Sequence, residues 1–233
     1  MGCTSSSVGG RGSIFTNPLP PLEQEETDGI SPVKQSTQSE KERNATGQAC
    51  FGAGCYWGTE KFFSRTFSKV QGLPPGKLVS GKVGFMGPVS APPNPNYEDV
   101  CTGKTGHVEV YNFEYTGGDE FYEAAVRYFF QFHDPTTLNR QGNDAGTQYA
   151  SVIYCYTKLQ FDIATRVKEQ LQLFLNNGNI PKGTYQSVRV STDIRMVETQ
   201  FFEAKQEHQD YLTKNPTGYC NHRLRLQTWP VNN

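Results

Sequence analysis

The chain has 233 residues and a formal net charge of -1, from 22 basic and 23 acidic residues, which fits one sizeable domain with additional segments. This near-neutral balance gives no case for nucleic acid or an acidic substrate as a ligand. No apolar run is long enough to cross a bilayer, and the N-terminus lacks the basic start and apolar stretch of a secretory signal. We therefore expect a cytoplasmic protein of a reducing compartment that binds no nucleic acid.

Residues 1–46 are rich in Ser, Gly, Pro, Gln, Thr and Glu, and their apolar residues are scattered singly. Such a segment cannot bury enough apolar surface to offset the entropy lost on ordering. The composition changes near Gln48. We predict a disordered tail over residues 1–46 and a catalytic domain over residues 47–233.

Strand-like and helix-like periodicities interleave in this second region without strict alternation. In chain order, the sequence predicts a strand at 49–54, a helix at 56–67, strands at 77–85 and 107–115, a helix at 119–134, a strand at 149–156, a helix at 159–175, a strand at 185–192 and a helix at 196–212. This order indicates an α+β protein, a two-layer sandwich of a mixed sheet with helices, with a ferredoxin-like core.

Two polar, glycine-bearing segments at 88–106 and 133–148 separate these elements. Loops longer than about 12 residues are unusual in a compact domain unless they have a function. They are therefore the first places to look for polar groups of an active site.

The six cysteines lie at positions 3, 50, 55, 101, 155 and 220, and their spacing matches no zinc-binding pattern. We therefore expect no metal. Free cysteines in a long intracellular chain are mostly buried, small apolar residues. This interpretation is favoured for Cys50, Cys101 and Cys155.

Cys55 differs because it follows Gly54 at a predicted strand-to-helix junction. The unpaired N–H groups and the dipole of a helix start favour an anion, so they are expected to lower the pKa of this thiol and make it a nucleophile. Tyr56 and Trp57 beside it provide an apolar wall for a small uncharged group. The alternative interpretation is a buried cysteine at a tight turn.

Polar residues of the loops and of strand 107–115 add an acid and hydrogen-bond donors. Glu109 among aromatic residues is expected to have a raised pKa and to donate a proton near neutrality. Tyr97 and Asp144 lie in the two loops, and Tyr149 directly follows the second loop. Taken one at a time, each has a simpler interpretation, a surface strand residue for Glu109 and half-buried loop aromatics for the tyrosines.

Four segments in order resemble the A-type peptide methionine sulfoxide reductase family. They are GCYWG (54–58), NPNYEDVCTGKTGHVEV (94–110), HDPTTLNRQGNDAGTQYASVIY (133–154) and HQDYLTKNPTGYC (208–220). The resemblance covers about residues 48–220. Position 56 is Tyr where the family usually has Phe, and GFMGP replaces the usual GYTGG block.

The resemblance implies reduction of methionine S-sulfoxide, free or in oxidised proteins, with no bound cofactor and by a monomer. Cys55 attacks the sulfoxide sulfur and Glu109 protonates its oxygen. Tyr97 and Tyr149 bind that oxygen, Asp144 supports them, and Tyr56 and Trp57 contact the substrate methyl group. The Cys55 sulfenic acid then condenses with Cys220, and thioredoxin, or dithiothreitol in vitro, reduces the disulfide.

The first residues, MGCTSS, match an N-myristoylation pattern at Gly2, with Cys3 as a candidate for palmitoylation. Stable anchoring needs both acyl chains, because this segment carries little basic charge. The expectation is association with the inner face of a membrane. The alternative is an ordinary small-residue terminus.

Three other functions remain open from the residues alone. A thiol peroxidase or redox sensor would use Cys55 without a methyl-binding wall. A cysteine hydrolase would need a histidine within hydrogen-bonding distance of Cys55. A non-enzymatic module that binds oxidised methionine would not need Cys55.

Overall fold

The computed structural model of the protein describes residues 45–231. A six-stranded sheet has the order β7-β6-β1-β3-β2-β8. Its strands are β7 (Asp193–Met196), β6 (Ser151–Cys155), β1 (Gly47–Ala53), β3 (Val108–Thr116), β2 (Lys77–Met86) and β8 (Phe202–Glu203). Among residues 45–231, β6 and β7 are the only strands that pair in parallel, so the sheet is mixed.

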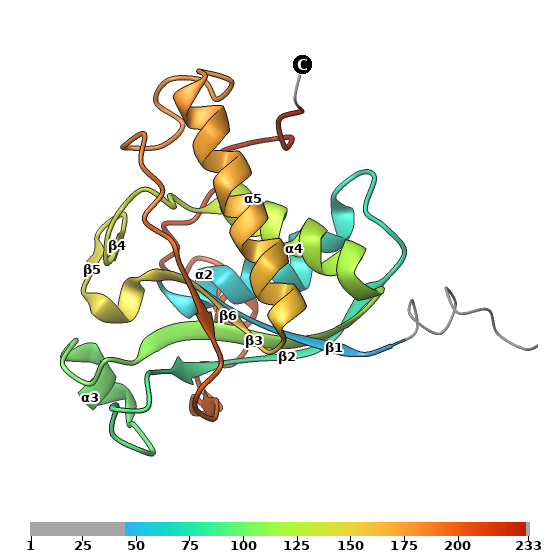
Figure 1. Cartoon of the computed structure of the whole chain (residues 1–233). Coiled ribbons are helices and arrows are strands. Elements are labelled where there is room, and N and C mark those ends of the chain that lie inside the picture. Colours follow the sequence, from blue (N-terminus) through green and yellow to red (C-terminus); the bar gives the residue numbers. More distant parts are fainter. Residues whose placement is uncertain (1–44, 232–233) are drawn as a thin grey trace, which may run out of the picture. The chain divides into compact units, whose positions relative to one another are not determined.

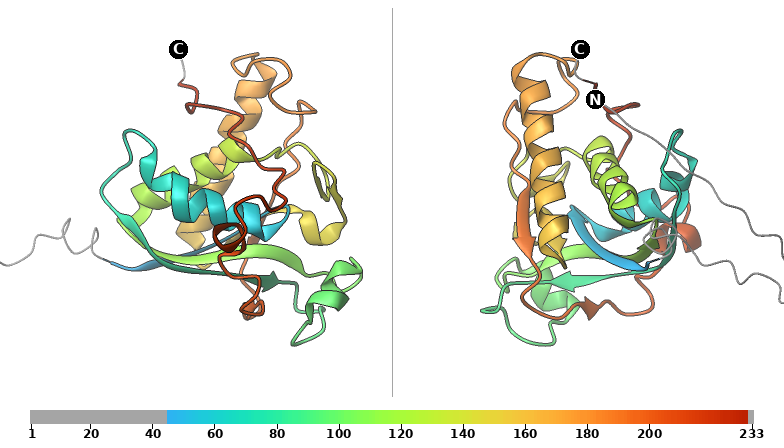
Figure 2. Two further views of the ribbon diagram at one scale, coloured as in Figure 1. Left: turned by 180° about the vertical axis from the view of Figure 1, so that it is seen from behind. Right: turned by 45° about the vertical axis from the view of Figure 1, so that its right-hand side comes forward.

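Three helices lie on one side of the sheet (Figures 1 and 2). They are α2 (Tyr56–Lys61), α4 (Gly118–Phe132) and α5 (Lys158–Asn176). The order β1-α2-β2-β3-α4-β6, with the central strands arranged β6-β1-β3-β2, is the βαββαβ arrangement of a ferredoxin-like core. The predicted α+β class and mixed sheet are confirmed.

The alternation of side chains along the strands explains this layering. Phe51 on β1 and Phe113 on β3 point to the helices, where Phe63 and Phe129 pack against them. Burying one such side chain fully stabilises the fold by about 1.5–3 kcal/mol. The opposite face of the sheet carries a smaller apolar cluster: Cys50, Met86, Val108, Val110, Val152 and Tyr154.

The two long loops contain short elements of their own. Segment 88–106 includes α3 (Tyr97–Cys101), whose first turn is capped by the Asn96 side chain, which accepts from the Asp99 N–H at 2.7 Å. Segment 133–148 includes the two-stranded pair β4 (Arg140–Gln141) and β5 (Asp144–Ala145), followed by a 3₁₀ turn at Thr147–Tyr149.

The strand predicted at 185–192 is wrong, because the final parallel strand is β7, which begins at Asp193. Side chains and loop carbonyls, not a neighbouring strand, accept the N–H groups of this segment. The Gln186 N–H donates to Asp134 Oδ2 at 2.9 Å, and the Val190 N–H donates to Gln172 Oε1 at 2.9 Å. Specific tertiary partners thus override the strand-like alternation.

The helix predicted at 196–212 is also wrong. This segment contains β8, which pairs with β2, and only one helical turn, α6 (Tyr211–Lys214). The Gln209 side chain replaces a strand residue at the edge of β2, because it bonds both the N–H and the C=O of Val83 at 2.9 Å. Within residues 45–231, no helix has the length and apolar character needed to span a bilayer.

Candidate active site

Cys55 lies where β1 ends and α2 begins, as the sequence predicts. Gly54 has φ +95°, a conformation that side chains disfavour, and a Cβ there would lie 2.4 Å from Cβ of Gln141. Cys55 is the N-cap residue of α2, and its C=O accepts from the Gly58 N–H at 3.1 Å. As a residue, Cys55 is partly exposed.

The expectation of a lowered Cys55 pKa is wrong in direction. Burial among neighbouring atoms raises the pKa of the thiol, and the negative charges of Glu109, Asp144 and Cys220 raise it further. The Trp57 N–H at the helix start lowers it, but this effect is the smaller one. An ionised Glu109 therefore opposes thiolate formation, whereas a protonated Glu109 does not.

Glu109 lies on β3 and is only 2% exposed. Its Oε2 accepts a hydrogen bond from the Tyr56 N–H, in the first turn of α2, at 3.0 Å. Burial raises the pKa of Glu109 to about 8, and the nearby Asp144 carboxylate contributes, while the Tyr56 N–H opposes the shift. The carboxyl group is therefore mostly protonated at neutral pH and can donate a proton, as expected from the sequence.

The polar loop residues gather around these two groups. Tyr97 is the first residue of α3, and Tyr149 ends the 3₁₀ turn that precedes β6. Burial raises the pKa of both phenols, and the Glu109 charge adds to the effect on each. Both hydroxyls consequently remain protonated and can donate hydrogen bonds to an oxygen bound beside Glu109.

Asp144 on β5 accepts a hydrogen bond from the Asn221 amide at 2.8 Å. Burial raises the pKa of Asp144, opposed by hydrogen bonds from Tyr219 and Asn221. Its carboxylate influences the pKa values of Cys55, Glu109 and Tyr149. The ionisable residues predicted for the site thus influence one another's pKa values, whereas Gly2 and Cys3 lie outside the described residues.

An aromatic wall, which we define as Trp57, Tyr97, His208 and Tyr211, begins two residues after Cys55 and is a connected set of stacked and tilted rings. Trp57 stacks on Tyr211 with ring centroids 3.7 Å apart, and His208 lies 4.6 Å from the Tyr97 ring. Tyr56 backs this wall and is only 1% exposed. Its hydroxyl has no hydrogen-bond partner among the described residues.

The C-terminal segment returns to the catalytic helix and places Cys220, which is partly exposed, near Cys55. His222 anchors this segment, because its Nε2 bonds the Ala53 C=O at 2.6 Å. A Cβ on Gly58 would lie 1.9 Å from Nδ1 of His222. Sequence reasoning missed this role, although the glycine at position 58 of the GCYWG segment was a usable signal.

The remaining cysteines and histidines test the expected packing of the other thiols and the alternative function as a cysteine hydrolase. Cys50 and Cys155 are buried, as expected, but Cys101 is exposed at the end of α3, so its expected packing is wrong. None of the hydrogen bonds among residues 45–231 joins a histidine to the Cys55 sulfur. His133 is bonded to Phe129 and Ser151, and His222 to Ala53. This geometry does not fit a cysteine hydrolase.

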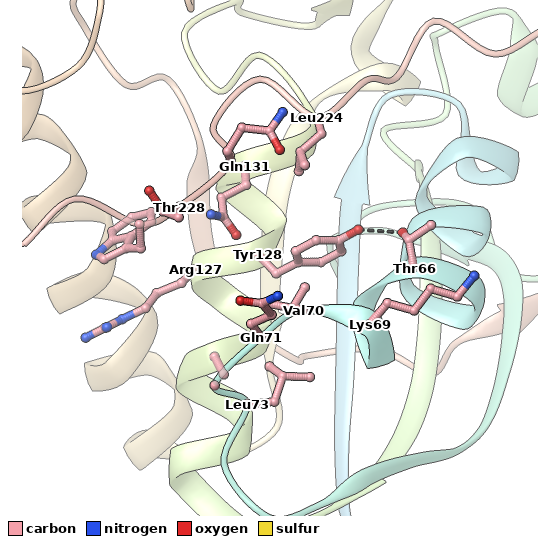
Figure 3. Close-up of a pocket in the computed structure, with 14 residues that line it drawn as sticks. Thr66, Lys69, Val70, Gln71, Leu73, Arg127, Tyr128, Gln131, Leu224 and Thr228 are labelled. Atoms are coloured by element: carbon pink, nitrogen blue, oxygen red, sulfur yellow. Dashed lines mark hydrogen bonds between the residues drawn. The ribbon is translucent and has the colours of Figure 1, made fainter.

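A cavity of about 510 Å³ lies elsewhere, between α4, segment 66–73 and segment 224–229. Tyr128 points into it and is hydrogen-bonded to Thr66, with Arg127, Gln131 and Leu224 on its walls (Figure 3). None of the candidate site residues lines this cavity. The described part of the chain also contains no group of three or more His, Cys, Asp or Glu side chains placed to hold a metal ion.

Comparison with known proteins agrees with this site. Residues 47–232 match the family model described as peptide methionine sulfoxide reductase. The mitochondrial peptide methionine sulfoxide reductase of Mus musculus is 36% identical over 208 residues, 88% of this chain and 77% of that protein. Peptide methionine sulfoxide reductase MsrA of Methanothermobacter thermautotrophicus is 41% identical over 173 residues, 74% of this chain and 90% of that protein.

Solved structures give the same result. Mxr1 from Saccharomyces cerevisiae in reduced form has a TM-score of 0.63 and 31% identity, covering 78% of this chain and 93% of that chain. Methionine sulfoxide reductase A of Corynebacterium diphtheriae has a TM-score of 0.61 and 34% identity, covering 75% of this chain and 77% of that chain. The chain therefore belongs to the peptide methionine sulfoxide reductase family.

Proposed function

We propose that the protein reduces methionine S-sulfoxide, in oxidised proteins or free, to methionine and so repairs oxidative damage. The observation that carries this proposal is the hydrogen bond between the Tyr56 N–H and Glu109, because it places a protonated acid at the helix start that carries Cys55. A thiol next to a neutral acid suits attack on a centre that carries a basic oxygen.

In the first step, Cys55 attacks the sulfoxide sulfur while Glu109 donates a proton to the oxygen and Tyr97 and Tyr149 donate hydrogen bonds to it. The oxygen is transferred to the Cys55 sulfur, so that the thiol becomes a sulfenic acid and the sulfoxide becomes a thioether. Trp57 contacts the substrate methyl group, with Tyr56 behind it. Asp144 holds the polar side of the site together with Asn221.

In the second step, the Cys220 thiol attacks the sulfenic sulfur, forms the Cys55–Cys220 disulfide and releases water. The anchoring of the neighbouring His222 on Ala53 supports this pairing. A dithiol of the thioredoxin type then restores both thiols by disulfide exchange and is itself oxidised. Dithiothreitol can replace it in vitro.

The proposal extends to the setting of the enzyme. Residues 47–233 form the catalytic domain, which acts as a monomer in the cytoplasm. Acylation of Gly2 and Cys3 would hold it at the inner face of a membrane, and the intact mass of the native protein tests this directly. An intact mass without an acyl group contradicts the anchoring.

The activity is tested by supplying each methionine sulfoxide epimer separately, first with dithiothreitol and then with thioredoxin. We expect turnover of the S epimer, no turnover in Cys55→Ser, and loss mainly of thioredoxin-supported turnover in Cys220→Ser. Absence of turnover for both epimers contradicts the proposal. Peroxide turnover that exceeds sulfoxide turnover would favour a thiol peroxidase instead.

A further inference from the structure

Glu60 is a second buried carboxyl group on the catalytic helix, and the steps above do not use it. It is 5% exposed and lies three residues after Trp57, so both side chains lie on the same face of α2. Its Oε1 accepts a hydrogen bond from the Asp210 N–H at 3.0 Å, and the neighbouring Tyr211 N–H favours its charged form. Glu60 therefore caps α6, a role that the Asp210 side chain does not perform.

This cap fixes the part of the chain that completes the aromatic wall. Asp210 has φ +53°, a left-handed conformation that is unfavourable for a residue other than glycine. Tyr211 follows it and stacks on Trp57 with an interplanar angle of 13°. On the other side, Gln209 is bonded to Val83 of β2. Glu60 and Gln209 thus hold the segment from opposite sides.

We infer that Glu60 is a positioning residue that sets Tyr211 and Trp57 against the substrate methyl group, and that its protonation tightens this wall. The inference rests on the proposed reductase function. It assigns to Glu60 an effect on substrate affinity and none on the transfer of oxygen to Cys55. Glu60 therefore controls how tightly the enzyme holds its substrate as the pH changes.

The groups that face Glu60 determine the direction of this effect. Burial raises the pKa of Glu60 to about 7, and the Asp210 carboxylate adds to it. The Lys214 ammonium and the two N–H groups lower it. Tyr111 on β3 also faces Glu60 and is a neutral phenol at these pH values, because burial and the charge of Glu60 raise its pKa.

Since burial penalises the charged form, ionised Glu60 favours solvent and the wall loosens as the pH rises through about 7. The N–H groups of Asp210 and Tyr211 bind the carboxylate more strongly than the acid, which is why they lower its pKa, but the burial penalty is larger and sets the direction. Substrate should therefore bind most tightly below this pH.

The test uses the full-length enzyme, its Glu60→Gln and Glu60→Ala variants, and Glu120→Gln as a matched control on the exposed face of α4. KM and kcat for a peptide that contains methionine S-sulfoxide are measured with dithiothreitol between about pH 5.5 and 8.5. The emission of Trp57 is recorded in a Trp229→Phe background, with and without Glu109→Gln and His208→Asn. These variants separate the titration of Glu109 and that of His208, whose ring stacks on Trp57.

In the wild type and the control, we expect KM to rise about threefold to tenfold as the pH rises through neutrality, because a loosened aromatic contact lowers the affinity for substrate by about this factor. The emission of Trp57 should shift over the same pH range. Glu60→Gln should keep the low KM at every pH and show no rise, because its amide oxygen does not titrate and still accepts the N–H groups. Glu60→Ala should have the high KM at every pH, with kcat little changed.

Two results would overturn the inference. One is a KM step and emission shift in Glu60→Gln equal to those of the wild type. The other is a folded Glu60→Ala variant with unchanged KM. If Glu60→Ala does not fold, the isosteric Glu60→Gln variant decides. Trp57 emission is read without turnover, so an enzyme inactive on sulfoxides would contradict the reductase function but still show whether Glu60 controls the wall.

Discussion

The Tyr56 N–H donates a 3.0 Å hydrogen bond to the Glu109 carboxyl group, which links the first turn of the catalytic helix to the central strand β3. The acid is thereby fixed beside the residue that carries the thiol. Burial keeps Glu109 protonated up to about pH 8. Above that pH, the negative charge of Glu109 opposes ionisation of the Cys55 thiol, so one carboxyl group affects both the supply of protons and the formation of the nucleophile.

The first prediction concerns the loss of this acid. Glu109→Gln keeps the shape and an acceptor for the Tyr56 N–H but cannot donate a proton of suitable acidity, so the rate of sulfoxide reduction should fall by about 10²- to 10⁴-fold. Methionine formation in the presence of dithiothreitol measures this. The control is Glu120→Gln, which should react like the wild type. A rate within a few-fold of the wild type in Glu109→Gln would mean that another group protonates the oxygen.

The second prediction is a pH dependence of the chemical step. Glu109 is the required acid only while protonated, whereas the Cys55 thiolate becomes more abundant with pH because burial raises the pKa of that thiol. The single-turnover rate of methionine formation should therefore rise with pH up to about 8 and level off above it, where the loss of the acid offsets the gain of thiolate. The Cys220→Ser variant, mixed with sulfoxide in the absence of reductant, isolates this step from thiol exchange. In Cys220→Ser/Glu109→Gln, the rate should continue to rise through pH 8. A rate that levels off near pH 8 in this variant would assign the change to a different group.

The third prediction follows from linkage. The folded pKa of Glu109 lies above the ordinary glutamate value, so its contribution to stability is complete below about pH 4.5 and is lost as the pH rises to about 8. Within that window the loss approaches about 1.4 kcal/mol per pH unit. Denaturant unfolding should thus show Glu109→Gln gaining stability over the wild type as the pH rises. Glu60 titrates in both proteins and cancels in the comparison. An equal pH dependence for both proteins would contradict the burial argument.

The fourth prediction concerns the contact between Gly58 and His222. A methyl group at position 58 clashes with the His222 ring and should displace the segment that carries Cys220. Gly58→Ala should therefore form the disulfide at least about tenfold more slowly than the wild type, an energy of about 1.4 kcal/mol, while still producing one methionine per enzyme. Quenched-flow mass mapping follows both products. Ser64→Ala, on the exposed side of the same helical run, is the matched control, and equal disulfide rates in Gly58→Ala and this control would contradict the anchoring role.

The fifth prediction concerns the Tyr56 hydroxyl, which is buried without a partner among the described residues. Because an unsatisfied buried polar group costs about 1–3 kcal/mol, Tyr56→Phe should raise the free energy of unfolding. Tyr128→Phe is the opposing control, since the Tyr128 hydroxyl is bonded to Thr66 and its removal should destabilise the protein. Loss of stability in Tyr56→Phe would show that this hydroxyl has a partner in solution.

The sequence predicted the parts of the fold that depend on local pattern. The strand-to-helix junction at Cys55, the alternating strand that carries Glu109 and both long helices have apolar periodicities that match their burial. The segments from 185 to 212 were predicted wrongly, because Gln172, Asp134 and Val83 supply hydrogen-bond partners that are distant in sequence.

The chemistry of the site also depends on residues that are distant in sequence, which limits what the sequence alone predicts. The position of Cys55 was predictable from GCYWG, but the direction of its pKa shift was not, because it depends on burial and on carboxylates brought in by β3 and β5. The anchoring of His222 on Ala53 joins residues at opposite ends of the domain. Gly58 signals that some group packs closely against the helix, but no local pattern identifies that group as His222.

The central claim is that Cys55 accepts the sulfoxide oxygen, and one experiment tests it most directly. Cys220→Ser is mixed with methionine S-sulfoxide without reductant, the methionine formed is counted per enzyme, and sulfenic acid is trapped with a dimedone-type reagent and located by peptide mass mapping. The account predicts one methionine per enzyme and one trapped sulfenic acid, at Cys55. No methionine, or a sulfenic acid at any other cysteine, would contradict it.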